Sequence, residues 1–368
     1  MKIARVEAIP VAVPVRTPLK MAVATVVVRT CIVVRITTDD GIEGIGESVL
    51  ATYFSGETLA SAVDLIENQF APALIGRDPG ELVAIRTLLR RIAVHNNGAR
   101  AAVETALHDV AATAAGVPLY EWYGGRVRDS VPTIWHVSGG SAAAHAAEAA
   151  AAVEAGYPLV KVKVGSPDYA NDVASVHAVR EAVGDRTQIL LDANQGFDVA
   201  DAIRFARDTA SARPAFLEQP VFREDLVGMA EVAAASPITI AADEGVFTAM
   251  DLRTHLHLRA AGAVVVKMMK AAGPIGVREV FAVADAAGIG VHFAGMAGQT
   301  SIGAAHAAHL ALAVPNLKYG SGISPQYLAD DIVVEPMRPI DGHLHPSSAP
   351  GVGVQLDEDQ LARYRAEP

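Results

Sequence analysis

The sequence predicts an α/β protein: a (β/α) barrel of TIM type that follows a smaller α+β domain. The main observation is a series of short apolar runs, each ending in a polar residue, that recur every 24 to 29 residues between His136 and Lys318. One strand, one helix and two short loops need about 25 residues, so this spacing indicates eight strands with helices between them. The residues before 128 show a different pattern, with three strand-like segments followed by helices.

The N-terminal segment predicts an antiparallel meander. Residues 2–14 alternate with the period of a strand, and their two prolines suit an edge position. A second strand is expected at residues 26–37 and a third at residues 42–47. Gly41 lies in the turn between these two strands, where a positive φ angle favours glycine.

Three helices are expected next, at about residues 57–70, 80–94 and 97–115. The third carries small and aliphatic residues at i, i+3 and i+4, which is typical of a helix packed along one face. Its polar residues lie off that stripe, and we expect them at the surface: Glu104, His108 and Asp109.

The strand expected at residues 157–165 has two chemically different faces. Lys161 and Lys163 share one face because side chains two residues apart point the same way, and three valines occupy the other. The valine face fits the helix layer, so the lysine face should look into the barrel, where buried cations need anionic partners. A half-exposed strand with two solvated lysines is the alternative interpretation.

Three carboxylates end the next three expected strands. Asp192, Glu218 and Asp243 each follow a short apolar run, and a barrel places the carboxyl ends of its strands on one rim, where active sites are built. Three hard oxygen ligands suit Mg²⁺, with Mn²⁺ as an alternative, and the lack of thiolates and imidazoles argues against Zn²⁺. The competing interpretation is a set of ion pairs between these carboxylates and the barrel lysines, although burying six charges without a task is costly.

Two lysines flank the predicted metal site. Lys163 on the second strand and Lys267 on the sixth are expected on opposite sides of the barrel axis. A lysine accepts a proton only when it is partly neutral, and we expect Lys161 and the metal to lower the pKa of Lys163. Mg²⁺ bound to a substrate carboxylate stabilises the enediolate that forms when the α-proton leaves. The sequence therefore predicts an enzyme that abstracts a proton α to a carboxylate, with these three lysines as its catalytic residues.

Composition excludes several classes of partner. The net charge is −11 and no basic stripe is present, which argues against nucleic acid. No apolar run is long enough to span a bilayer, the N-terminus lacks the pattern of a signal peptide, and the single cysteine, Cys31, cannot form an intrachain disulfide. We therefore expect a soluble cytoplasmic protein with a small-molecule carboxylate as its partner and no membrane contact.

Several of these segments also resemble a known family. The motifs are Lys161-Val162-Lys163, Asp192-Ala193-Asn194, Glu218-Gln219-Pro220, Ala242-Asp243-Glu244 and Val266-Lys267-Met268-Met269-Lys270. They look like the muconate lactonizing enzyme subgroup of the enolase superfamily. The resemblance covers essentially the whole chain, including residues 38–47, the linker at 124–130 and the tail at 350–353.

The resemblance implies a modified barrel of this superfamily at residues 129–330, an α+β capping domain at 1–128, and a C-terminal segment at 331–368 that packs back on them. It also implies a Mg²⁺-dependent isomerase that forms a homo-oligomer, with His292 in the barrel wall. Cap loops at about 15–25 and 48–56 would close over the substrate. The residues that support the ligands or contact the substrate would then include Lys20, Met21, Tyr53, Phe54, Asn194, Glu244 and Gln299.

The reaction is less well defined, because several positions depart from the family's patterns. Gly320-Ser321-Gly322 and Gln299 stand where muconate cycloisomerases carry a Glu after strands eight and seven. The Asp-x-Asp of dipeptide epimerases is missing, and Gly322-Ile323-Ser324 is similar to N-acylamino-acid racemases. We expect lactonisation of a muconate-like dicarboxylate, as in a muconate cycloisomerase. The alternatives are a racemase or epimerase of N-acylated amino acids (similar to N-succinylamino acid racemase/o-succinylbenzoate synthase), a related dehydratase, or a catalytically silent binding barrel.

Overall fold

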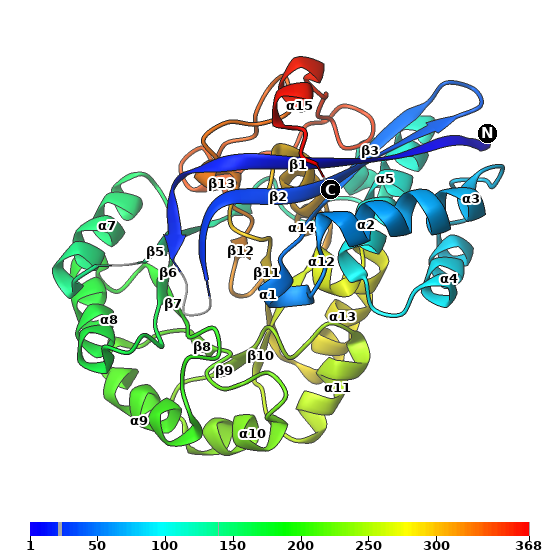
Figure 1. Ribbon diagram of the computed structural model, residues 1–368. Helices are drawn as coiled ribbons and strands as arrows, with labels where there is room; N and C mark the ends of the chain where they lie inside the picture. The colour runs from blue at the N-terminus through cyan, green and yellow to red at the C-terminus, as the bar shows by residue number, and fades with distance from the viewer. Residues whose placement is uncertain (21–23, 139, 368) are drawn as a thin grey trace.

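The structure is a computed structural model that describes residues 1–20, 24–138 and 140–367, apart from the side chain of Lys20. It has two parts: an N-terminal antiparallel sheet with its helices, and an eight-stranded parallel sheet surrounded by helices (Figure 1). The predicted fold class is confirmed. Met21, one of the predicted substrate neighbours, lies outside the described residues.

The N-terminal sheet contains three antiparallel strands in the order β1-β2-β3. β1 (Ile3–Lys20) forms an edge, as its prolines predicted, and pairs with β2 (Thr25–Thr38), which in turn pairs with β3 (Glu43–Val49). The prediction of a loop at residues 15–25 was wrong over most of that range. Both strands extend toward the barrel. Their pairing is interrupted between Pro14 and Leu19, where Val15 bridges Leu328, and it resumes at Leu19 and Lys20, so the backbone of this segment has partners in β2 and in the barrel part.

Helices follow the sheet along the chain, and α5 packs closely on β3. This approach requires glycine, because a Cβ atom on Gly46 would lie 2.2 Å from the carbonyl oxygen of Ala102. The helices of this part are α1 (Thr52–Ser55), α2 (Leu59–Leu65), the π-helical segment η1 (Ile66–Phe70), α3 (Ala71–Leu74), α4 (Leu82–Ile92), α5 (Asn97–Ala115) and α6 (Leu119–Trp122).

The polar residues of α5 are buried, and the prediction that they lie at the surface was wrong. Glu104, His108 and Asp109 are each at most 5% exposed. Asp109 accepts a hydrogen bond from the main-chain N–H of Ile45 in β3 (2.8 Å), and Glu104 accepts one from the N–H of Ile275 in the barrel part (2.7 Å). The apolar stripe was a poor guide because α5 packs on the sheet on one side and on barrel helices on the other.

The parallel sheet contains eight strands in chain order. They are β5 (Ile134–Val137), β6 (Leu159–Lys163), β7 (Gln188–Asp192), β8 (Phe216–Glu218), β9 (Ile240–Ala242), β10 (Ala263–Lys267), β11 (Gly290–Ala294) and β12 (Ser321–Gly322). A bridge between Thr133 and Ser321 brings the two ends of the sheet together. The eighth strand was expected to end at Lys318. It begins instead three residues later, at Ser321, because residues 317–320 form a turn.

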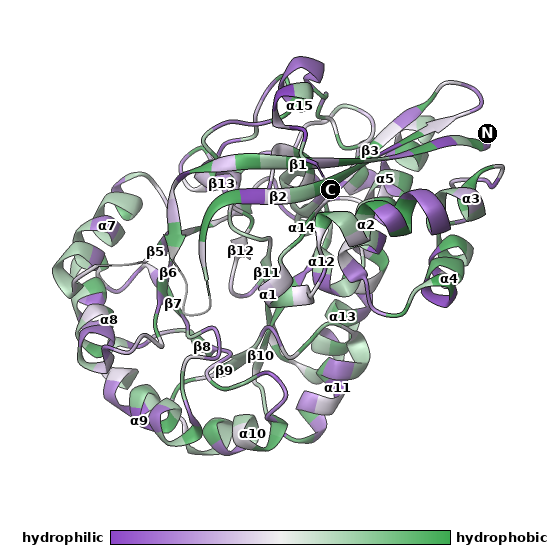
Figure 2. Cartoon of the chain, viewed as in Figure 1, coloured by the Kyte–Doolittle hydropathy of each residue, from purple (hydrophilic) through white to green (hydrophobic). Residues whose placement is uncertain are grey.

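The helices that connect these strands form the outer layer. They are α7 (Ala142–Glu154), α8 (Tyr169–Val183), α9 (Val199–Thr209) with the 3₁₀ turn η2 (Ala210–Ala212), α10 (Leu226–Ala235), α11 (Ala249–His257), α12 (Met268–Ala271), α13 (Pro274–Ala287) and α14 (Ser301–Ala313). Hydrophilic and hydrophobic residues alternate along them, as α9 and α11 illustrate (Figure 2). This pattern fits helices with one face on the strands and one in water.

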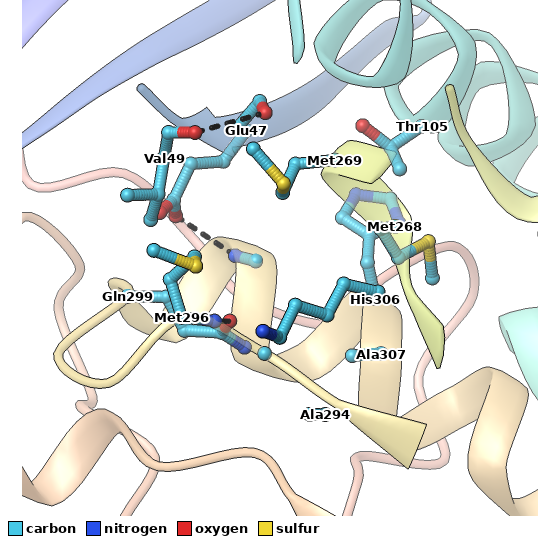
Figure 3. Close-up of a pocket in the computed structure, with 14 residues that line it drawn as sticks. Glu47, Val49, Thr105, Met268, Met269, Ala294, Met296, Gln299, His306 and Ala307 are labelled. Carbon is cyan, nitrogen blue, oxygen red and sulfur yellow. Dashed lines mark hydrogen bonds between the residues drawn. The ribbon is translucent and has the colours of Figure 1, made fainter. Parts of the chain in front are cut away.

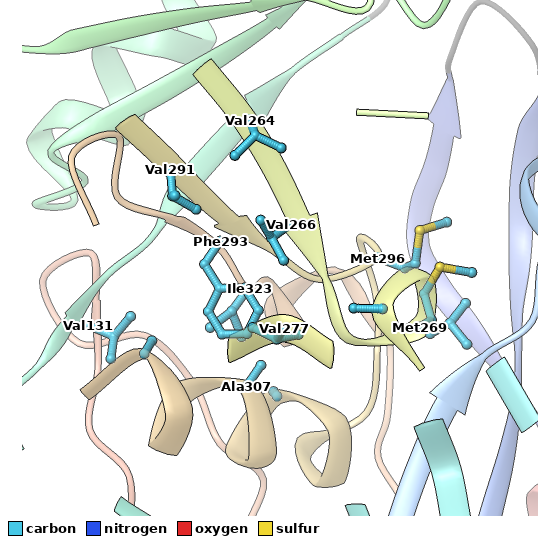
Figure 4. Close-up of a cluster of buried hydrophobic side chains, with 14 of the residues drawn as sticks. Val131, Val264, Val266, Met269, Val277, Val291, Phe293, Met296, Ala307 and Ile323 are labelled. Atoms are coloured by element: carbon cyan, nitrogen blue, oxygen red, sulfur yellow. The ribbon is translucent and has the colours of Figure 1, made fainter. Parts of the chain in front are cut away.

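The barrel strands have the two faces that the sequence predicted. Val160 and Val162 belong to the large apolar cluster between strands and helices, and Lys161 lies on the opposite face of β6. Figure 4 shows part of the same cluster, where Val266 of β10 and Phe293 of β11 lie near the helix that carries Ala307. The polar residues of the strands are therefore left for the barrel interior and its rim.

The C-terminal segment contacts both parts. β13 (His343–Leu344) pairs with β4 (Val131–Pro132) just before the barrel, and α15 (Glu358–Tyr364) packs against β1. The 3₁₀ turn η3 (Pro325–Tyr327) also contacts β1. Domain boundaries at residues 128 and 330 stay predictions. No helix within the described ranges is both long and apolar enough to cross a membrane.

Glu47 of β3 joins the N-terminal sheet to the barrel. Its carboxylate accepts hydrogen bonds from the main-chain N–H groups of Thr300 (3.1 Å) and Gly303 (2.9 Å), at the start of α14. The first N–H groups of a helix have no partner within the helix, and a negative charge is favourable there. Although burial raises the pKa of Glu47, these hydrogen bonds oppose the rise. The buried carboxylate thus fixes the first part to the second.

His306 and His309 of α14 are buried at the same contact. Burial lowers the pKa of His306 to about 3 and that of His309 to about 4. Nε2 of His306 lies 2.7 Å from the carbonyl oxygen of Ile45 and donates its proton there in the neutral ring. Unfolded histidines have a pKa of about 6.5, so the unfolded chain binds more protons as the pH falls from about 6.5. The free energy of unfolding should therefore fall with pH in this range.

We expect His306→Gln to reduce this acid sensitivity. Between pH 7.5 and 5.0, the wild type should lose about 2 kcal/mol more of its unfolding free energy than the variant, because glutamine takes up no proton. Urea unfolding at the two pH values measures the difference. The exposed His257→Gln is the control and should follow the wild type. Equal pH dependence in His306→Gln and wild type would contradict the assignment.

Candidate active site

Lysines and carboxylates meet at the C-terminal rim of the barrel. β6, β7 and β8 are in register, so that Lys163 lies beside Asp192 and Asp192 lies beside Glu218. Asp243 follows β9 directly, and Lys267 ends β10. The structure therefore brings together the five residues that the sequence placed on one rim; four of them are buried and Lys163 is half-buried.

Each carboxylate is paired with a lysine. Nζ of Lys161 lies 2.6 Å from Oε2 of Glu218, and Nζ of Lys163 lies 2.5 Å from Oδ2 of Asp192. Lys267 pairs with Asp243. These are the contacts that the ion-pair interpretation predicts. As the side chains stand in the described parts of the chain, no three Asp, Glu, His or Cys residues converge closely enough to hold a metal ion.

The carboxylates nevertheless have the chemistry of a cation site. Asp192, Glu218 and Asp243 are at most 3% exposed and lie on adjacent strands. Burial raises the pKa of Glu218 to about 8, and the charges of Asp192 and Asp243 act in the same direction. One oxygen of the neighbouring Glu244, Oε2, is buried and has no hydrogen-bond partner among the described residues. A hard divalent cation would relieve this crowding of negative oxygens, so the donor set fits Mg²⁺.

The carboxylates also control the lysines. Burial lowers the pKa of Lys163, but Asp192 and Glu218 outweigh burial and hold that pKa above its ordinary value. The same balance raises the pKa of Lys267, where Asp243 is the strongest opposing charge. The predicted lowering of the pKa of Lys163 is therefore outweighed by its carboxylate neighbours in this arrangement.

Asn194 and Glu244 support the rim, in keeping with their expected place beside the ligands. Oδ1 of Asn194 accepts a hydrogen bond from Nζ of Lys163 (2.7 Å), and its Nδ2 donates to Oε1 of Glu244 (3.1 Å). The backbone of Asn194 has a φ angle of 41°, which asparagine tolerates better than most residues. This turn directs the amide toward both partners. Burial raises the pKa of Glu244 to about 7, and the charge of Asp243 adds to the effect.

Two supporting residues had no role in the sequence analysis. Nζ of Lys270 lies 2.6 Å from both Oδ1 and the main-chain oxygen of Asp243, and 2.8 Å from the carbonyl oxygen of Val265. Oε1 of Gln219 accepts from the N–H groups of Asp243 and Gly245, both at 3.1 Å. The sequence did contain a signal for them, because both residues lie inside the family motifs quoted above. Their role becomes visible only when the loops after neighbouring strands meet.

The cavity above the rim is lined by both parts of the chain. The N-terminal part contributes Leu19, Arg29, Tyr53 and Phe54, and the barrel contributes side chains that include Ile134, His136, Ser138, Gln195, Met296 and Ala297. The ring of Phe54 lies 4.5 Å from Nζ of Lys267, which is cation–π distance. Tyr53 and Phe54 thus lie where the sequence placed them. Lys20 ends β1, and its side chain is outside the described part of the structure.

Two other predicted residues do not line this cavity. Gln299 lines an adjoining small pocket between β3 and the barrel, together with Glu47 and His306 (Figure 3), and this pocket shares Lys267 and Met296 with the cavity. Its Oε1 accepts a hydrogen bond from the N–H of Met296 (3.1 Å), so it holds the loop after β11. His292 is fully buried inside the barrel, and its Nδ1 lies 2.9 Å from the carbonyl oxygen of Tyr319. It is a barrel-wall residue, as expected.

Comparison with known families agrees with this geometry. Residues 144–360 match the family described as "Enolase C-terminal domain-like", and residues 3–124 match "Mandelate racemase / muconate lactonizing enzyme, N-terminal domain". The chain belongs to the enolase superfamily. Muconate cycloisomerase 1-2 of Acinetobacter lwoffii is 34% identical over 371 residues, which cover 100% of this chain and 96% of that protein.

Solved structures in the superfamily share the fold over the full length. The muconate lactonizing enzyme of Pseudomonas fluorescens complexed with muconolactone has a TM-score of 0.95 and 34% identity, with 99% of each chain covered. The dipeptide epimerase of Enterococcus faecalis V583 complexed with Mg and a dipeptide has a TM-score of 0.91 and 30% identity, covering 96% of this chain and 100% of that one. The chain is thus an isomerase of the enolase superfamily, in the muconate lactonizing enzyme subgroup.

We expect Lys270→Met to destabilise the fold, because it removes one of the two lysines that neutralise the buried Asp243, together with a donor to two carbonyl oxygens. The free energy of unfolding should fall by about 3–5 kcal/mol, the usual effect of removing one partner of a buried ion pair. Urea unfolding at pH 7.5 measures this change. Lys318→Met is the control, since Lys318 is exposed. If the two variants lose equal stability, Lys270 does not hold Asp243 in place.

Proposed function

We propose that this isomerase uses Mg²⁺ to remove a proton α to a carboxylate, with Asp192, Glu218 and Asp243 as the metal ligands. The observation that carries the proposal is the set of three buried carboxylates on adjacent strand ends, flanked by the half-buried Lys163 and the buried Lys267. Bound Mg²⁺ would act as a Lewis acid on the substrate carboxylate and make the α-proton more acidic. The Mg complex of the related dipeptide epimerase supports the choice of ion.

Lys163 is proposed as the principal acid/base. Its ammonium group is held by one carboxylate oxygen and one amide oxygen, which fixes the direction of Nζ. Lys161, on the same face of β6 and bound to Glu218, keeps a positive charge beside the substrate carboxylate. An enediolate that forms there is stabilised by these fixed charges, which require no reorganisation during the reaction.

Lys267 is proposed as the second proton-transfer or electrostatic group. β6 and β10 are four strands apart in an eight-stranded sheet, so Lys163 and Lys267 approach the cavity from opposite sides. Phe54 covers Lys267 from the N-terminal part and excludes water from one side of it. A substrate between the two lysines would present a different face to each of them.

Cycloisomerisation of a muconate-like dicarboxylate is the function we favour. Full-length similarity to muconate cycloisomerases supports it. The acidic side chains that line the cavity, among the described residues, are Asp192, Glu218 and Glu244, and all three belong to the rim. Asp192 and Glu218 are proposed metal ligands, and Glu244 lies beside them and accepts from Asn194, so no carboxylate of the described residues lines the cavity away from the rim to hold the ammonium group of a dipeptide.

Racemisation of an N-acylated amino acid is the second candidate. The observation in its favour is the placement of two lysines on opposite sides of the cavity, because a racemase needs one group for each face of the α-carbon. An N-acylated amino acid also lacks the free ammonium group for which the cavity offers no partner. The two candidates share the removal of the α-proton and differ in the fate of the enediolate.

We expect one Mg²⁺ ion to bind per chain, and Glu218→Gln to weaken this binding. Loss of one of three charged ligands should raise the Kd by about tenfold or more, which corresponds to about 1.4 kcal/mol or more. Isothermal titration calorimetry on both proteins measures the Kd. Glu224→Gln, on the exposed loop after β8, is the matched control. Equal binding by wild type and Glu218→Gln, or none by either, would show that the ligands are wrongly assigned.

The lysine variants separate the two reactions in a D₂O exchange assay with Mg²⁺ and a set of dicarboxylates and N-acylamino acids. With Lys267→Met, a racemase should lose turnover in both directions, while Lys163 still exchanges the α-proton of one enantiomer. A cycloisomerase that relies on Lys163 should keep lactonisation, slower by about 10²–10⁴-fold. Proton NMR follows both outcomes, with Lys318→Met as the control. If only Lys267→Met abolishes exchange, the two lysines have the opposite roles.

A further inference from the structure

Besides Oε2 of Glu244 at the rim, three buried polar atoms of cavity-lining residues have no hydrogen-bond partner among residues 1–20, 24–138 and 140–367. They are Nε of Arg29, the hydroxyl of Tyr53 and Nδ1 of His136. None of these residues belongs to the lysine and carboxylate groups at the rim. Buried polar groups normally have partners, because an unmade hydrogen bond costs about 1–3 kcal/mol. Three such atoms in one cavity therefore indicate a ligand that supplies the partners.

Arg29 is the strongest of these signals. It lies on β2 and is 3% exposed, and in the described part of the chain no carboxylate lies within 4 Å of it. Its one hydrogen bond there runs from Nη2 to the carbonyl oxygen of Ala297, in the loop after β11 (2.6 Å). A buried guanidinium is seldom left without an anion, because the loss of its hydration is expensive. The fork of the guanidinium also suits a carboxylate.

Tyr53 and His136 add further polar groups to the same cavity. Tyr53 comes from α1 of the N-terminal part, and His136 lies on β5, beside Lys161 of β6. The main-chain N–H of His136 donates to the hydroxyl of Tyr327 (2.7 Å), and the two rings lie 5.5 Å apart, which holds the imidazole in place. The cavity lining also includes the apolar residues Leu19 and Ile134.

We propose that Arg29, with Tyr53 and His136, binds a second anionic group of the substrate, and that this contact makes the isomerase selective for dianionic carboxylates. The inference rests on the proposed function for the position of the reacting carboxylate at the rim. Arg29 and Tyr53 come from the N-terminal part, whereas the rim belongs to the barrel. A dianionic substrate therefore contacts both parts at once, and Arg29 is a specificity-determining residue.

The alternative is that Arg29 only fastens the loop at Ala297 to β2. Binding experiments on the Mg²⁺-loaded protein distinguish the two roles. The probes are the straight-chain dicarboxylates from succinate to pimelate, each compared with the monocarboxylate of the same chain length. For at least one length, the wild type should bind the dicarboxylate about 10- to 100-fold more tightly, the usual range for a charge-assisted contact. Isothermal titration calorimetry gives each Kd.

Arg29→Gln should remove this preference and leave the Kd for the monocarboxylate within about twofold of the wild type, because glutamine keeps an N–H donor for Ala297. Arg29→Lys should retain part of the preference, because it keeps the charge and loses the fork. Arg16→Gln is the matched control. Arg16 also bonds a barrel-side carbonyl, that of Leu328 (2.9 Å), but does not line the cavity.

Two results would overturn the proposal: equal affinity of the wild type for both members of every pair, or an equal loss of both affinities in Arg29→Gln. The wild-type comparison can overturn the proposal even if neither Arg29 variant folds. The outcome is also separable from the proposed function. A dicarboxylate preference without α-proton exchange on any substrate would leave the Arg29 site standing and remove the proposed reaction. If α-proton exchange on monocarboxylates is equally fast in wild type and Arg29→Gln, and no dicarboxylate is preferred, the proposed reaction stands and the Arg29 site is removed.

Discussion

The balance of buried charge at the barrel rim is the constraint on which the rest of the structure depends. Lys161, Lys163, Lys267 and Lys270 face Asp192, Glu218 and Asp243 in a region that is nearly closed to solvent. Every one of these groups would be costly to bury alone. Pairing them across adjacent strands makes their burial tolerable, and it also sets their proton affinities. The same arrangement that keeps the fold intact thus prepares the groups that the proposed reaction needs.

Buried charged and polar side chains are also paired at the contact between the N-terminal sheet and the barrel, where their partners are main-chain groups. Glu47 accepts N–H groups at the start of α14, Glu104 accepts one at the start of α13, and His306 donates to a carbonyl oxygen of β3. These buried polar contacts fix the position of β2 and α1 above the rim. Arg29, Tyr53 and Phe54 reach the cavity because of this placement. Substrate selection is therefore divided between a part that carries the chemistry and a part that covers it.

Errors in the sequence-based expectations have a common physical origin. A single apolar stripe predicted exposure for Glu104, His108 and Asp109, but α5 has a second buried side that is polar and satisfied by hydrogen bonds. The loop expected at residues 15–25 is mostly strand, because β1 pairs with β2 and also bridges Leu328 of the barrel part. In each case, the element has a second neighbour that its own residue pattern does not reveal. The pattern of apolar residues along an element indicates one of the elements that pack against it and does not indicate a second.

The sequence by itself determined the period of the barrel, the lysine and valine faces of β6, and the rim that collects the three carboxylates. These features depend on strand alternation and on the regular length of a β/α unit, which are local properties of the chain. Only the tertiary structure decided which lysine pairs with which carboxylate and that Lys270 and Gln219 hold Asp243. It alone brought Arg29 from β2 to the cavity. Those facts depend on contacts between loops of separate strands and between the barrel and a sheet from another part of the chain. The spacing of residues within one segment does not predict such long-range contacts.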